Sequence, residues 1–150
     1  MSNKLQKLFT EFHSPKLNLP NRVVMAPMTR FFSPDGIPGQ NVADYYRRRV
    51  EGGASLIITE GTTVNDPGAS PHADGPHCHG EKALAGWKKV VEAVHGAGGK
   101  IMPQIWHVGM MRRAADTPHP DLKNASPSGI LHNEKKIAEP LTEAQIETLL

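Results

Sequence analysis

Ala54-Ser-Leu-Ile-Ile-Thr59 is the stretch that decides the fold, because it is short and almost entirely apolar. A half-exposed strand alternates apolar and polar residues, whereas a strand covered on both faces of a parallel sheet is apolar throughout. Gly52-Gly53 stands directly before the stretch and is typical of a helix end. The stretch therefore predicts a buried strand in a parallel sheet.

Helices and strands are predicted to alternate on both sides of this strand. Upstream, Arg22 to Ala26 is a short apolar run that ends at Pro27, and Gln40 to Glu51 has apolar residues at helical spacing. Downstream, Glu81 to His95 predicts a second helix, and Lys100 to Ile105 predicts a third strand. The second helix carries one apolar stripe, which comprises Leu84, Trp87, Val90, Val91 and Val94.

A third helix is predicted to begin at Thr142-Glu-Ala-Gln145, which has the pattern of a capping box, with Leu141 placed as a hydrophobic staple. The element order β-α-β-α-β-(α) is typical of a parallel α/β fold. Long loops follow strands and short loops follow helices, as in a β/α barrel. A doubly wound sheet has the same order but usually carries a glycine-rich turn after its first strand, and Pro27-Met-Thr-Arg-Phe31 is not one.

About two and a half βα units do not close a barrel and would leave sheet edges open. We therefore expect residues 1–150 to be the N-terminal part of a single barrel domain, either truncated or split, that continues beyond Leu150 or pairs with another half.

The composition is that of an ordinary globular protein. The net charge is +2 and the basic residues are scattered, which argues against a nucleic-acid surface. The single cysteine, Cys78, allows no internal disulfide and fits a reducing cytoplasm. We see no apolar run long enough for a signal peptide or a membrane span, so a cytoplasmic location without a membrane partner is expected.

Several stretches at the predicted strand ends resemble the old yellow enzyme family. The matching stretches follow one another in order: Asn21-Arg-Val-Val-Met-Ala-Pro-Met-Thr-Arg30, Tyr45-Tyr46-Arg-Arg-Arg, Gly53 to Gly61, Gly86-Trp87 to Val94-His95, Gln104-Ile-Trp-His-Val-Gly109, Ala125-Ser-Pro-Ser128 and Pro140-Leu-Thr-Glu. No single stretch is decisive, and their common order carries the resemblance. The family consists of (β/α)8 TIM-barrel reductases that bind FMN. They take hydride from NADPH or NADH and pass it to an activated alkene such as an enone.

The resemblance implies that residues at three successive strand ends contact the FMN ring. Pro27, Met28 and Thr29 follow the first strand, and the Thr29 hydroxyl would lie near the flavin C4 carbonyl and N5, although Thr29 could instead only cap a turn. Gly61 would let the backbone approach the ring, or would simply allow a turn. Gln104 would offer an amide donor and acceptor to the flavin edge.

The resemblance also implies roles around this ring. Trp106, together with Thr29, would line the substrate pocket, with core packing as the alternative for the tryptophan, whereas Trp87 is expected in the core. Arg30 is expected to hold the flavin loop by ion pairing. His107 is either a hydrogen-bonding support or a satisfied loop residue.

The segment His72 to His79 contains three histidines, a cysteine and an aspartate. Metal ligands in zinc sites are usually spaced by two or more residues, and His77-Cys78-His79 would point its side chains in different directions. We therefore predict no metal site. Because this loop often carries an aromatic residue in relatives, its composition here leaves substrate specificity open.

The family's proton-donating tyrosine, its substrate-anchoring His with Asn or His, and its phosphate site would all lie downstream, so no catalytic residue is expected in this chain. We expect an FMN-dependent ene reductase that is active at full length, while the chain alone is inactive and binds FMN weakly or not at all. Its partners would be a small enone-type substrate and the missing half or a homo-oligomer. The alternatives are a non-catalytic half-barrel that associates through open sheet edges, and a relative with an iron–sulfur cluster whose cysteines lie downstream.

Overall fold

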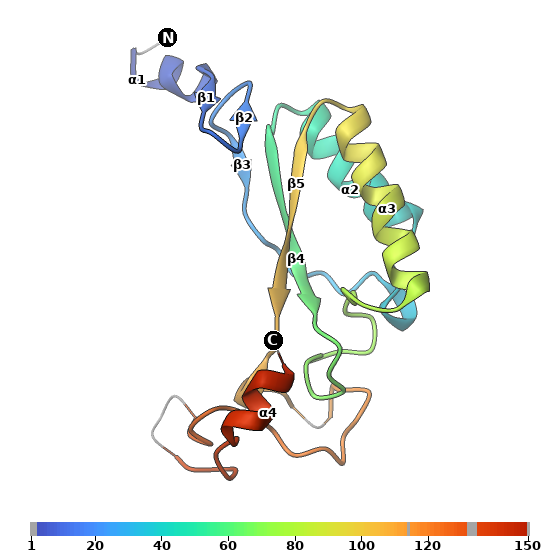
Figure 1. The fold of residues 1–150 in the computed structure, drawn as a ribbon. Coiled ribbons are helices and arrows are strands. Elements are labelled where there is room, and N and C mark those ends of the chain that lie inside the picture. The colour runs from blue at the N-terminus through green and yellow to red at the C-terminus, as the bar shows by residue number, and fades with distance from the viewer. Residues whose placement is uncertain (1–2, 114, 132–134, 150) are drawn as a thin grey trace.

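The computed structural model describes residues 3–113, 115–131 and 135–149. Its centre is a parallel sheet of strand order β3-β4-β5. The strands are β3 (Val24–Met25), β4 (Leu56–Thr63) and β5 (Lys100–Trp106). The helices α2 (Gln40–Glu51) and α3 (Glu81–Gly96) connect them, and both lie on the same side of the sheet (Figure 1). The fold is therefore β-α-β-α-β with helices covering one face.

The hydrophobic core lies between this sheet and the two helices. Ile57 of β4 is fully buried, and the facing sides of α2 and α3 pack on it. The buried cluster comprises Val42, Ala43, Tyr46, Val50, Ile57, Val90 and Val94. Trp87 packs against this cluster as expected, and its indole Nε1 donates to the carbonyl oxygen of His77 at 2.9 Å.

Most predicted elements are confirmed, and α2 has the predicted ends. The predicted end of the central strand is wrong, because β4 continues from Thr59 through Glu60 to Thr63. Glu60, Thr62 and Thr63 are buried, and Thr62 and Thr63 pair with β5, but their polar character gives no apolar run in the sequence. The first strand is shorter than predicted and covers Val24–Met25 alone.

The N-terminal segment adds elements that the sequence did not predict. They are α1 (Asn3–Gln6), the 3-10 turn η1 (Lys7–Phe9) and an antiparallel pair of β1 (Phe12–His13) with β2 (Asn18–Leu19). These elements are too short to produce a periodic pattern. Further 3-10 turns are η2 (Pro34–Gly36) and η3 (Gly109–Met111).

The predicted capping box is confirmed at the start of α4 (Glu143–Thr148). The backbone N–H of Thr142 donates to Gln145 Oε1 at 2.9 Å, and the backbone N–H of Gln145 donates to Thr142 Oγ1 at 3.3 Å. This short helix lies beyond the C-terminal end of β5 (Figure 1). Among the helices of the described residues, none is both long and apolar enough to cross a membrane.

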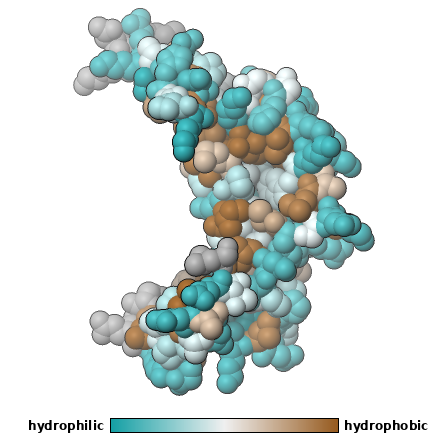
Figure 2. Space-filling model, in the orientation of Figure 1, coloured by the Kyte–Doolittle hydropathy of each residue, from teal (hydrophilic) through white to brown (hydrophobic). Residues whose placement is uncertain are grey.

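The sheet has open edges, as predicted, at β3 and β5. On β5, Met102 and Ile105 are about half exposed. The prediction that Leu84 belongs to the apolar core stripe of α3 is wrong. Leu84 is 50% exposed and borders a groove rather than the core. Figure 2 shows apolar surface gathered over the middle of the molecule, while its two ends are mostly polar.

Candidate functional site

The C-terminal ends of the three parallel strands bring the predicted site residues together at one end of the sheet. We call this end the site edge, to distinguish it from the open lateral edges at β3 and β5. Gly61 of β4 stands directly opposite Gln104 of β5, and Thr63 stands opposite Trp106. The segment Pro27 to Thr29 follows the C-terminal end of β3, which pairs with β4. In β/α folds this end of the sheet carries the chemistry.

Two polar side chains at this edge have no hydrogen-bond partner among the residues that the structure describes. Thr29 is exposed, and its hydroxyl makes no hydrogen bond to any residue that the structure describes. The side-chain amide of Gln104, which is partly buried, likewise bonds to none of the described residues, although its backbone N–H donates to Thr59 Oγ1 at 3.1 Å. Both groups are therefore available to a ligand.

The indole of Trp106 leaves no room for a side chain at position 61. A Cβ at Gly61 would overlap the indole ring, which lies directly against the glycine backbone. The indole Nε1 is buried and has no hydrogen-bond partner in the described part of the chain. A buried N–H without an acceptor is costly, so this atom is a third polar group that a ligand could satisfy.

Glu60 is a residue that the sequence analysis missed. Its side chain is fully buried and forms an ion pair with Arg30, with 3.4 Å between Arg30 Nη2 and Glu60 Oε1. The expectation that Arg30 holds its loop by ion pairing is thus confirmed. The available signal was a glutamate that directly follows the predicted apolar strand.

Tyr46 supports Glu60 from helix α2. The backbone N–H of Glu60 donates to the Tyr46 hydroxyl at 2.8 Å. Burial is the main cause that raises the pKa of Tyr46 to about 12. The phenol therefore stays neutral at physiological pH and serves as a fixed polar group beneath the strand end.

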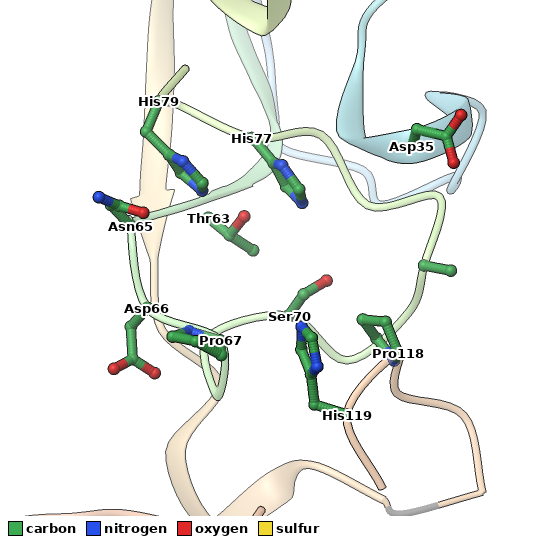
Figure 3. A pocket seen from close by; sticks show the side chains of 11 residues that line it. Asp35, Thr63, Asn65, Asp66, Pro67, Ser70, His77, His79, Pro118 and His119 are labelled. Carbon is green, nitrogen blue, oxygen red and sulfur yellow. The ribbon is translucent and has the colours of Figure 1, made fainter.

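A separate pocket of about 370 Å³ lies beside this edge, between the loops that follow β4 and β5 (Figure 3). His77 and His79 stack there with ring centroids 4.7 Å apart. Burial, followed by the charge of His79, lowers the pKa of His77. The predicted flavin-contacting residues do not line this pocket.

The expectation that His77, Cys78 and His79 point in different directions is correct for Cys78 only, because the two histidine rings stack on each other. His72 stacks on Phe31 with 4.6 Å between the ring centroids. Cys78 lines an apolar groove beside Trp87, while His77 lines the pocket. Within the described ranges, no group of three or more His, Cys, Asp or Glu residues is placed to hold a metal ion.

His107 joins two loops. Its Nδ1 accepts the backbone N–H of Gly109 at 2.9 Å, and its Nε2 lies 3.2 Å from Asp66 Oδ1. Since a backbone N–H can only donate, the proton of the neutral ring must be on Nε2, facing Asp66. His107 therefore ties the loop after β5 to the loop after β4.

The sequence profile of the NADH:flavin oxidoreductase / NADH oxidase family matches residues 7–149 of this chain. The chain is 43% identical over 107 residues to 12-oxophytodienoate reductase 7 of Oryza sativa subsp. japonica, and this match covers 71% of the chain. It is 40% identical over 106 residues, 70% of the chain, to a chanoclavine-I aldehyde reductase of Penicillium roqueforti. These matches cover 26% and 28% of the two relatives.

Solved structures show the same fold. Morphinone reductase in complex with tetrahydroNAD superposes with a TM-score of 0.80 at 34% identity, covering 94% of this chain and 42% of that one. An old yellow enzyme homologue from Zymomonas mobilis gives a TM-score of 0.78 at 28% identity, covering 95% of this chain and 42% of the other. The chain thus has the fold of part of a TIM barrel and spans well under half the length of these proteins.

Proposed function

The chain belongs to the NADH:flavin oxidoreductase / NADH oxidase family, and we propose that the C-terminal end of its parallel sheet supplies the flavin-ring contacts of an FMN-dependent ene reductase. Such an enzyme would reduce an activated C=C bond, as in an enone, by ping-pong transfer of hydride from NADPH or NADH. Residues 1–150 would form the N-terminal part of its single barrel domain.

One observation carries this proposal, namely three polar groups at the C-terminal end of the sheet that have no partner within residues 3–113, 115–131 and 135–149. They are the Thr29 hydroxyl, the Gln104 amide and the Trp106 Nε1. One follows β3 and two belong to the C-terminal part of β5, on the side of the sheet where β/α barrels place their ligands. A ring with carbonyl oxygens and an N–H along its edge would satisfy such groups, so the residues present fit FMN.

When bound, FMN supplies the redox chemistry by accepting a hydride from the nicotinamide and giving it to the alkene. The chain's own residues would orient and tune the ring. The Gln104 amide can donate to a ring carbonyl and accept from the adjacent N–H. The Thr29 hydroxyl can donate to the electron-rich side of the ring and so favour its reduced form.

The remaining residues would shape the walls of the site. Pro27 and Met28 would form an apolar wall against the ring, and Met28 is 60% exposed and free to do so. Gly61 would keep the strand backbone close to the ring and to Trp106. Trp106 would face the substrate. The proton donor, the substrate anchor and the phosphate site would come from outside this chain, whose partner would be the remaining barrel half or a second copy. The enzyme would be located in the cytoplasm.

A non-catalytic half-barrel is the second candidate, and the open edge strand favours it. Met102 and Ile105 of β5 are half exposed, and an apolar groove of about 130 Å³ lies between α3 and β5. Such a chain would associate through this surface and bind no flavin alone.

Complementation distinguishes the two candidates. The chain is mixed with the part of morphinone reductase that lies outside the aligned segment, and the complex is purified after addition of FMN. We expect a yellow complex that oxidises NADH in the presence of an enone. A folded complex that stays colourless would contradict the flavin proposal and favour the half-barrel. The matched control is the same complex with Gln104→Ala, which should retain less flavin.

A further inference from the structure

We propose that Glu60 is a positioning residue, whose buried carboxylate fixes segment 28–31 and with it the Thr29 hydroxyl at the sheet edge. The inference rests on the proposed function, in which Thr29 contacts the flavin ring. Glu60 itself would touch neither flavin nor substrate.

The carboxylate is bonded to the backbone of the segment it would hold. Glu60 Oε2 accepts the backbone N–H of Arg30 at 3.0 Å and that of Phe31 at 3.2 Å. The side chain of Glu60 is 0% exposed. Hydrogen bonds to a charged acceptor are stronger than those to a neutral one, and a buried carboxylate is tolerated only with such partners. The two N–H groups that follow Thr29 are therefore held by one rigid anion.

A β-bulge brings Glu60 to this place. Ile58 pairs with Met102 and Gly61 pairs with Gln104, so that Thr59 and Glu60 together stand opposite Pro103. Proline has no N–H to give to the ladder. Bulges of this kind redirect side chains beside functional sites. The proline in β5 thus accounts for the break in pairing at the position of Glu60.

The backbone of Glu60 is fixed on both sides. Its N–H donates to the Tyr46 hydroxyl, and its carbonyl oxygen accepts the hydroxyls of Thr59 at 2.8 Å and Thr62 at 3.0 Å. These groups are all buried. A carboxylate on such a support has little freedom to move away from the segment.

The segment itself is held in an unfavourable backbone conformation. Phe31 has φ +57°, which is the left-handed region that bulky residues rarely adopt. Strain of this kind persists only where the surroundings enforce it. The Glu60 carboxylate bonds to the N–H of this same residue, and the Arg30 guanidinium stacks 3.4 Å from the centre of the Tyr45 ring. Thr29 lies two residues before Phe31, and its side chain forms no hydrogen bond with the described residues.

Amide hydrogen exchange in the chain tests the proposal without any flavin. In the unmodified protein, the amides of Arg30 and Phe31 should exchange at least about tenfold more slowly than those of Thr29 and Phe32. Glu60→Gln should remove most of this difference. Equal exchange rates at the four amides of the unmodified protein would overturn the proposal, and this comparison decides even if the variant does not fold.

Two further variants separate positioning from ion pairing. Arg30→Gln removes the charged partner but keeps the backbone N–H, so we expect the slow exchange at residues 30 and 31 to survive. If Arg30→Gln abolishes it as fully as Glu60→Gln does, Glu60 serves only the ion pair and the proposal fails. Glu51→Gln, on the exposed surface of α2, is the matched control and should leave both rates unchanged.

The response of the Thr29 NMR signal to added FMN distinguishes a positioning role of Glu60 from a purely structural one. The NMR signal of Thr29 should shift with millimolar FMN in the unmodified chain and shift at least about threefold less in Glu60→Gln at equal FMN. An equal shift in both proteins would overturn the positioning role. A shift in neither would count against the proposed function alone, and the exchange rates would still decide for or against Glu60.

Discussion

The central strand β4 and the edge strand β5 differ in whether their polar side chains have hydrogen-bond partners in the described part of the chain. On β4, Thr59, Glu60 and Thr62 are buried, and their side chains bond to protein groups. On β5, the Gln104 amide and the Trp106 Nε1 have no partner among the described residues. Buried polar groups are usually satisfied, so the polar groups of β4 belong to the scaffold, while those of β5 are the ones for which we propose a ligand.

The largest expected effect is on the scaffold side of this comparison. Ile57→Ala in β4 should lower the free energy of unfolding by about 2 to 5 kcal/mol, because it leaves a cavity in the core between the sheet and both helices. Urea denaturation followed by circular dichroism measures it. Ile105→Ala on β5, which is 49% exposed, is the control. Equal losses in the two variants would break the comparison.

At Gly61, strand β4 is in direct contact with the Trp106 side chain of strand β5. Gly61→Ala should lower the free energy of unfolding by about 1 to 3 kcal/mol, because the new methyl overlaps the indole ring. Adding Trp106→Ala should recover part of the loss, since the two sites are coupled. Gly96→Ala has open space around the new methyl and is the control. The idea fails if Gly61→Ala is as stable as the unmodified chain.

The histidine pocket should make stability depend on pH. Burial lowers the pKa of His77 below the ordinary value of a histidine. Between the unfolded and the folded pKa, the unfolded chain binds the proton and the folded chain does not. Stability should therefore be complete above about pH 6.5 and decrease as the pH falls from there through the folded pKa. His77→Phe should flatten this decrease in thermal unfolding curves, and an unchanged slope would contradict the assignment.

The smallest effect is expected at the open edge. Met102→Lys replaces a side chain that is 51% exposed, so the free energy of unfolding should change by less than about 0.5 kcal/mol. Denaturant titration provides the measurement. A larger loss would mean that the β5 edge is covered in solution, for example by a second copy of the chain, and sedimentation velocity would then detect the dimer.

The sequence predicted the helices and the place of the sheet because apolar periodicity reports directly on burial. It also predicted that Thr29, Gly61 and Gln104 share one edge, because parallel strands end on the same side. It did not predict the continuation of β4 to Thr63, since polar residues become buried only when tertiary partners satisfy them. Glu60 was missed for the same reason, because its role depends on a bulge opposite Pro103 and on a tyrosine from another element.

An FMN titration of the isotope-labelled chain, followed residue by residue by NMR, tests the central claim most directly. The account predicts weak binding, in the range above micromolar, with shifts centred on the Thr29 amide, the Gly61 amide and the side-chain amide of Gln104. Shifts centred on His77 and His79, or no shift at the three edge residues, would contradict the placement of the flavin site. A sub-micromolar affinity would contradict the claim that this edge supplies only part of the site.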